Sequence, residues 1–239
     1  MVATYSRISD HIIMVDEMPL SEAAQILGVT PRQAQRLAAN GELGHTRRVG
    51  RTVVVAPTAV YRARNNGTTS RGRPALPATA WVALDLLSGR PAQGQFERRL
   101  LARLSAMSPI EVARFARRRA TITQMRVISR RAQRDMPENL IAAGLQPTGL
   151  MSPLITDWGL AGGRPEDVID GYLYVSSARA LRELGLREEP GGRIALRILD
   201  APVEPLPPAV VALDLMESMD SRARSVGRER LAEMIDGLR

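Results

Sequence analysis

The sequence predicts a mainly α-helical protein with a smaller α/β part, and three observations lead to this fold class. Helical periodicity with capping residues recurs over residues 18–64 and 78–136, and a strand, a helix and a strand follow in the C-terminal part. The 16 Pro and 19 Gly fall in clusters, which favours several small units. We expect the following order: an N-terminal tail (1–17), a unit of helices and a hairpin (18–65), an Arg/Gly/Pro linker (66–77), a basic helical segment (78–136) and a C-terminal α/β unit (137–239).

Charge is distributed unevenly along the chain. All 33 basic residues are Arg, and residues 1–139 carry a net charge of +12 whereas residues 140–239 carry −4. A basic surface of this kind suits a polyanion, although a highly charged surface without a partner remains the alternative. Cysteine is absent, and no apolar run is long enough to cross a bilayer. We therefore expect a cytoplasmic, nucleoid-associated protein without disulfides and without a membrane partner.

The stretch "LSEAAQILGVTPRQAQRLAANG" predicts two short helices joined by a tight turn. Ser21 is expected to cap the first helix, and Gly28 to supply the backbone conformation for the turn. Thr30 should cap the second helix, with Pro31 at its first position and Gly41 just beyond its end.

A hairpin and a third helix follow. "GELGHTRRVGRTVVV" predicts two strands around a tip at residues 48–51, and Thr58 is expected to cap a helix that ends near Arg64. This order resembles the winged helix-turn-helix of the excisionase and MerR-like family over residues 18–64, although Ala34 and Thr52 depart from its pattern. The matching residues are Leu20, Glu22, Ala23, Ala24, Leu27, Gly28, Val29, Thr30, Arg36, Gly41, Leu43, Arg48, Gly50 and Arg51.

The resemblance implies that the second helix enters the major groove of double-stranded DNA. Arg32, Gln33 and Arg36 would then face base edges, where Arg suits guanine and Gln suits adenine. The expected DNA-binding residues of this unit are Thr30, Arg32, Gln33, Gln35 and Arg36 on the helix and Arg47, Arg48 and Arg51 on the hairpin. The alternative is that Arg32 and Arg36 are ordinary solvated charges.

The linker "RNNGTTSRGRPALPAT" contains an Arg-Gly-Arg-Pro sequence that resembles the tetrapeptide of AT-hook proteins. Arg71 and Arg73 could reach a narrow, A·T-rich minor groove. The alternative, equally open from the sequence, is a flexible hinge whose arginines touch phosphate or nothing.

The basic segment predicts further helices. Ser108-Pro109-Ile110-Glu111 is typical of a capping box, and we expect the helix that it opens to run to about Arg134. Arginines that could form a second phosphate-facing surface are Arg114, Arg117, Arg118, Arg119, Arg126, Arg130 and Arg131. An acidic protein partner, or the acidic part of this chain, is the alternative ligand for them.

The C-terminal part predicts a strand at residues 172–175, a helix at 178–184, a strand at 194–199 and two final helices. Residues 82–86 and 211–215 both read Val-Ala-Leu-Asp-Leu, which indicates two similar helices. The whole layout resembles an AbiE-type antitoxin of the AbiEi-like group, on the N-terminal unit, "RGRPALPATAWVALDLLSG", "DGYLYVSSARALRELGL" and "PAVVALDLMESMDSRARSVGRERLAEM". The resemblance implies a repressor that binds its own promoter and pairs with a nucleotidyltransferase-like toxin.

Residues for catalysis are scarce, and we expect no enzyme activity, cofactor or metal. His11 and His45 have no carboxylate pair at metal-ligand spacing. Asp167 and Asp170 are three residues apart, so a strand would place them on opposite faces. Two alternatives to an antitoxin stay open: a phage or recombination regulator with the same DNA-binding unit, and a module that chiefly binds a protein partner.

Overall fold

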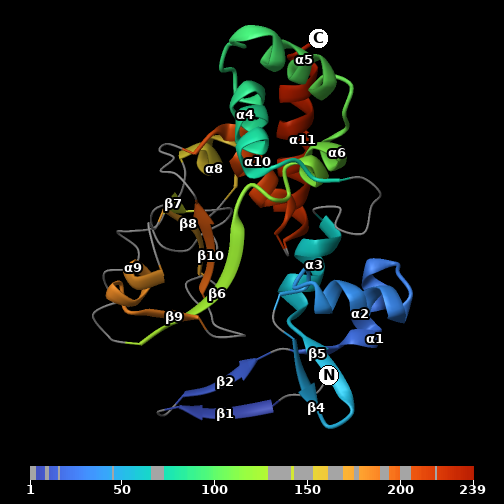
Figure 1. The fold of residues 1–239 in the computed structure, drawn as a ribbon, viewed down its shortest axis with the longest axis vertical. Coiled ribbons are helices and arrows are strands. Elements are labelled where there is room, and N and C mark those ends of the chain that lie inside the picture. The colour runs from blue at the N-terminus through green and yellow to red at the C-terminus, as the bar shows by residue number, and fades with distance from the viewer. Residues whose placement is uncertain are drawn as a thin grey trace.

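The computed structural model describes residues 4–8, 11–15, 17–44, 46–65, 73–128, 141–142, 153–160, 169–174, 178–188, 194–199, 206–218 and 220–239. Over these residues the protein is mixed α/β, and its elements form three groups (Figure 1). A group of helices lies at the top of Figure 1, and below it lie the five-stranded sheet on the left and the N-terminal unit (residues 18–65) on the right.

The N-terminal unit begins with two helices, α1 (Leu20–Leu27) and α2 (Pro31–Ala39). Gly28 ends α1 with a φ of +65°, a left-handed conformation that residues with a side chain rarely adopt. Thr30 caps α2 and Pro31 takes the first helical position, as predicted. The predicted cap at Ser21 is wrong, because α1 already begins at Leu20 after Pro19.

The predicted hairpin and third helix are present. Strands β4 (Thr46–Val49) and β5 (Thr52–Val55) pair antiparallel around a two-residue tip, and β3 (Met18–Pro19) pairs with the other edge of β5. Helix α3 (Pro57–Asn65) begins one residue before the predicted cap. Apolar side chains of all these helices and of β5 form one core that belongs to this unit.

A further hairpin lies where the sequence predicted an N-terminal tail. β1 (Thr4–Ile8) and β2 (His11–Val15) pair antiparallel and project from the bottom of Figure 1.

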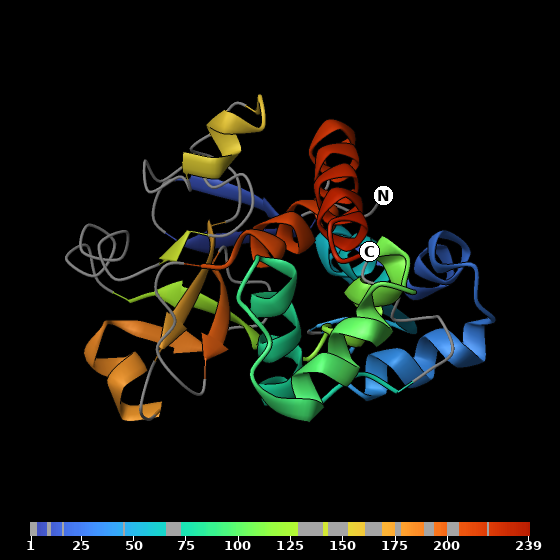
Figure 2. The ribbon, with the colours of Figure 1, turned by 90° about the horizontal axis from the view of Figure 1, so that it is seen from above.

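The helices of the second group pack around α10, which is buried on every side. Its neighbours include α4 and α11, as seen from above in Figure 2. Helix α10 can be buried on every side because its sequence is almost entirely apolar. Eight of its nine residues are buried, and only one of those eight, Asp214, is charged. The helices are α4 (Pro77–Leu87), α5 (Gly94–Leu104), α6 (Pro109–Phe115), α8 (Pro153–Asp157), α10 (Pro208–Met216) and α11 (Ser221–Asp236).

The sheet has the strand order β7-β8-β10-β6-β9. The predicted strand, helix and strand are present, and β8 lies parallel to β10. An additional strand, β9, pairs with the far edge of β6. The elements are β6 (Thr121–Val127), β7 (Ile141–Ala142), β8 (Ile169–Tyr174), α9 (Ala178–Glu183), β9 (Leu186–Glu188) and β10 (Ile194–Leu199).

The long helix predicted after Ser108 is wrong beyond Phe115. The capping box is present and opens α6, but α6 has only seven residues and the chain then enters β6. The run Thr121-Ile122-Thr123 is β-branched, which favours extended backbone. β6 pairs with β10 on one edge and with β9 on the other, and this pairing satisfies its backbone hydrogen-bonding groups. Both partner strands are distant in the sequence, so no local sequence pattern predicts the pairing.

Helices α10 and α11 approach so closely that one position accepts only glycine. A Cβ atom on Gly227 would lie 2.5 Å from the carbonyl oxygen of Ala212 and 2.9 Å from the nitrogen of Met216. Both atoms belong to the backbone of α10, so neither can move without shifting the helix. Gly227 is therefore a packing requirement inside α11, despite the low helix propensity of glycine.

We predict that Gly227→Ala destabilises the fold by about 1–3 kcal/mol, because overpacking outweighs the gain in helix propensity. Urea unfolding followed by circular dichroism measures the change. Gly237→Ala is the matched control, since a Cβ there meets nothing closer than 3.5 Å. A Gly227→Ala variant as stable as the wild type would contradict the close approach.

Candidate nucleic-acid interface

One face of α2 is exposed along its length. Ala34 and Leu37 turn inward and are buried in the core of the N-terminal unit. The helical repeat then directs the remaining side chains to solvent, and all five residues predicted to face DNA are exposed: Thr30, Arg32, Gln33, Gln35 and Arg36. We call these five residues the α2 face.

The α2 face holds a hollow of about 460 Å³, lined by Thr30, Arg32, Gln33 and Arg36. Within the part of the chain that the structure describes, neither Arg32 nor Arg36 pairs with a carboxylate. Two exposed positive charges therefore stand together on one helix without an internal partner. Such a surface can bind an anion without first breaking an ion pair.

Thr30 and Gln33 form a reciprocal capping box at the start of α2. The Thr30 hydroxyl accepts a hydrogen bond from the backbone nitrogen of Gln33 at 3.3 Å. The side-chain oxygen of Gln33 accepts from the Thr30 backbone nitrogen at 2.9 Å and from the Thr30 hydroxyl at 3.1 Å. The box fixes the first turn of the helix and the position of the Gln33 side chain.

The three hairpin arginines differ in their surroundings. Arg48 and Arg51 are exposed and have no ion pair among the described residues. Arg47 instead binds both oxygens of Glu17, with its Nε atom 2.6 Å from Oε1. These hydrogen bonds raise the pKa of Arg47 above its ordinary value. Arg47 therefore links the hairpin to Glu17 at the start of the unit. The charges of Arg48 and Arg51 are not neutralised by any described residue.

The linker arginines are only partly described. Arg71 lies outside the described residues, and Arg73 is exposed. Pro74 is buried, and the backbone nitrogen of Ala75 donates to the oxygen of Phe115 at 2.9 Å. The chain is therefore held against α6 directly after Arg73.

The arginines predicted to form a second basic surface around residues 114–131 differ in exposure, and Arg126 is partly buried. Arg118 is exposed, but Arg119 is buried, and Arg114 lies 3.9 Å from Glu111. Arg117 lies 3.8 Å from Glu42, the second residue after the cap of α2. The turn that carries Arg117 and Arg118 is thereby placed beside the end of α2. Arg130 and Arg131 fall outside the described residues.

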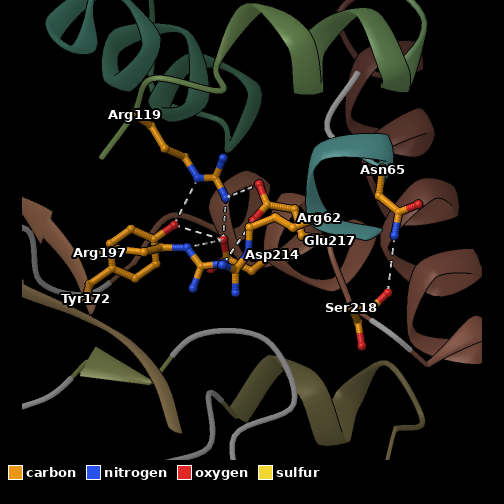
Figure 3. A network of polar contacts seen from close by, with 8 residues as sticks. All are labelled: Arg62, Asn65, Arg119, Tyr172, Arg197, Asp214, Glu217 and Ser218. Carbon is orange, nitrogen blue, oxygen red and sulfur yellow. Dashed lines mark hydrogen bonds and ion pairs between the residues drawn. The ribbon is translucent and has the colours of Figure 1, made fainter. Parts of the chain in front are cut away.

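Arg119 belongs to a buried polar cluster, the arginine network, which Figure 3 shows from close by. Its Nη2 atom lies 2.6 Å from Asp214 and 2.9 Å from Glu217, and its Nε atom donates to the Tyr172 hydroxyl at 2.9 Å. The Tyr172 hydroxyl donates to Asp214 at 2.8 Å, and Arg197 Nη2 donates to Glu217 at 3.0 Å. The network thus joins the entry to β6, strands β8 and β10, and the end of α10.

Two contacts connect the N-terminal unit to this network. Arg62 of α3 lies 3.7 Å from Glu217, and the Asn65 side chain donates to the backbone oxygen of Ser218 at 3.3 Å (Figure 3). The last turn of α3 therefore contacts Glu217 and Ser218, which directly follow α10. The position of the α2 face relative to the rest of the protein depends partly on these contacts.

Charge compensation keeps Glu217 ionised. Asp214 and Glu217 lie at the C-terminal end of α10, where the helix dipole disfavours negative charge. Burial would raise the pKa of Glu217, but the charges of Arg119, Arg197 and Arg62 outweigh it and lower that pKa to about 2. Burial also raises the pKa of Tyr172 well above its ordinary value, so its hydroxyl stays protonated and able to donate.

Sequence reasoning missed Tyr172, Arg197, Asp214 and Glu217 as interacting residues. A signal was present, because Asp214 interrupts the apolar run "AVVALDLM" and Arg197 interrupts the apolar strand "IALRIL". A charge inside a fully buried element indicates a buried partner.

Nothing in the described residues provides a metal site, since no three His, Asp or Glu side chains there come together. His45 and Asp167 fall outside the described residues, and the side chains of His11 and Asp170 are also not described. The described helices are all too short or too polar to span a membrane. No protein-family model, curated protein or solved structure matches this chain.

We predict that Glu217→Gln destabilises the fold by about 3 kcal/mol at neutral pH, because it leaves buried arginines without their carboxylate. The folded-state pKa of Glu217 is lower than its unfolded value, so its stabilising effect is complete above about pH 4.5 and is lost as the pH falls towards 2. The difference in unfolding free energy between wild type and variant should therefore shrink over this range.

Urea unfolding at a series of pH values measures this difference. Glu233→Gln is the control, because Glu233 is exposed and pairs only with Arg230 in the described structure. If the difference in unfolding free energy between wild type and Glu217→Gln stayed constant from pH 6 to pH 3, the lowered pKa of Glu217 would be contradicted.

Proposed function

We propose that this protein is a sequence-specific DNA-binding transcriptional repressor whose N-terminal unit acts as a winged helix-turn-helix. The observation that carries the proposal is the α2 face: two arginines around a hollow that form no ion pair with any described residue, on a helix whose other side is packed in a core. An α-helix with its side chains is about 10–12 Å in diameter, which fits the major groove of about 12 Å width.

The hairpin supports this proposal. Arg48 and Arg51 are exposed on the two-residue tip and the strand that leads to it, and their charges are available for phosphate. Arg118 and Arg73 are exposed near α6, and the contact between Arg117 and Glu42 places this region beside the end of α2. The bound duplex would therefore meet positive charge on more than one element.

The antitoxin role is supported by the resemblance to the AbiEi-like group. On this proposal the DNA-binding unit represses a promoter shared with a nucleotidyltransferase-like toxin, and the C-terminal part neutralises that toxin. Co-expression of the full chain with such a protein from the neighbouring reading frame tests this role. Relief of growth inhibition supports it, and persistent inhibition contradicts it.

We predict that Arg36→Ala weakens binding to the DNA upstream of the protein's own gene by about 1–3 kcal/mol and relaxes base preference at one position. Arg48→Ala and Arg51→Ala should weaken binding to all duplexes alike and lower the salt slope by about 1 each. Fluorescence anisotropy at several salt concentrations measures both effects.

Arg98→Ala is the matched control for these variants. Arg98 is exposed and unpaired in the described structure, but it lies on α5, far from α2 in Figure 1. Equal losses for Arg36→Ala and Arg98→Ala would mean that binding is unspecific attraction to a basic protein, and the α2 face would not be the reading surface.

A further inference from the structure

The hydrogen bonds of Gln33 lead to a further inference, which rests on the proposed function and names the base that this residue selects. A free Gln side chain reads adenine with two hydrogen bonds, donating to N7 and accepting from the N6 amino group. Both ends of the amide must be available for that pairing. In this protein only one end is available.

The acceptor end of Gln33 is already saturated. A carbonyl oxygen has two lone pairs, and this one accepts from the Thr30 backbone nitrogen at 2.9 Å and from the Thr30 hydroxyl at 3.1 Å. The orientation of the amide is unambiguous, because a backbone nitrogen can only donate and its partner must therefore be the oxygen. The amide nitrogen has no partner among the described residues, and the side chain is exposed.

The other long side chains of the hollow share this property. The guanidinium groups of Arg32 and Arg36 carry only hydrogen-bond donors. All three would therefore act as donors towards DNA: the two arginines have no acceptor, and Gln33 could accept from an amino group only by giving up its capping box. Gln35 is exposed, has no hydrogen bond among the described residues and does not line the hollow, so it keeps both ends of its amide.

We propose that Gln33 reads DNA as a donor only and selects guanine, not adenine, in the major groove. Guanine presents two acceptors there, N7 and O6, and both can receive N–H groups of the amide. Adenine and cytosine each present an amino group, which would face the donors of the hollow, and thymine presents a single acceptor, O4, beside its C5-methyl group, so guanine alone offers two acceptors and no amino group. The sites preferred by this protein should therefore carry guanine opposite the first turn of α2.

Replacement of Gln33 by Glu separates base reading from capping. The Glu carboxylate can accept the same bonds from Thr30, since Ser/Thr-x-x-Glu is also a capping box. Glu has no N–H group, and its second oxygen can accept from the amino group of cytosine. Gln33→Glu should thus keep the fold and exchange a preference for guanine for one for cytosine.

The experiment selects duplexes from a library with a randomised 20-base-pair segment, using the full-length wild type, Gln33→Glu, and Gln95→Glu as the matched control. Gln95 is exposed on α5, outside the α2 face. The wild type should enrich guanine at a position where Gln33→Glu enriches cytosine. Duplexes that differ only there should change affinity at least about tenfold in opposite directions for the two proteins. Gln95→Glu should leave this position unchanged, and unaltered thermal unfolding of Gln33→Glu would show that its capping box is intact.

Three outcomes of the selection would contradict either the inference about Gln33 or the proposed function. Enrichment of adenine by the wild type at the position that Gln33→Glu alters would overturn the inference while leaving the proposed function standing. A Gln33→Glu profile identical to that of the wild type would also overturn it, because Gln33 would then contact no base. If the wild type enriches no sequence from the library, the proposed function itself fails.

Discussion

The ion pairs at the end of α10 are the constraint on which the arrangement of the molecule depends. Asp214 and Glu217 are buried at the helix terminus that least tolerates negative charge, and Arg119 and Arg197 compensate them. These arginines come from the entry to β6 and from β10, so the compensation exists only when helix, sheet and connecting turn are all in place. Through Arg62 the same charges also restrain α3, and with it the N-terminal unit.

Some arginines of this chain are buried in ion pairs and others are exposed, and the positions of the acidic residues determine which arginines are which. Arginines opposite Asp214 and Glu217 are buried and hold the fold together. Arginines on the α2 face and at the hairpin tip are exposed and form no ion pair with the acidic side chains that the structure describes. Glu17 and Glu42 each form an ion pair with one partly exposed arginine, Arg47 and Arg117 respectively, at the margin of the exposed face.

Local signals predicted the N-terminal unit well, and non-local contacts explain what was missed. Gly28, Thr30 and Pro31 act on their immediate neighbours, so the turn and the start of α2 could be read from a few residues. β6 depends on pairing with Ile194 and its neighbours, about 70 residues away, which no local pattern shows. Asp85 and Asp214 occupy the same place in identical pentapeptides, yet only Asp214 is buried: Asp85 is partly exposed beside Arg90, five residues later, whereas Asp214 binds Arg119, 95 residues earlier in the sequence. The cap at Thr30 was predicted from the sequence, whereas the part that Gln33 takes in it, and the base preference proposed from it, needed the two distances to the Gln33 oxygen.

The place of β6 in the sheet has a consequence for the integrity of the chain during synthesis and turnover. β6 is made early, but its partner strands β9 and β10 follow after residue 185. A premature stop or a proteolytic cut between them would leave β6, a β-branched strand, with two bare edges that can pair with other chains. The basic and acidic parts of this protein are therefore inseparable as folded fragments, and degradation of one would release an aggregation-prone remnant of the other.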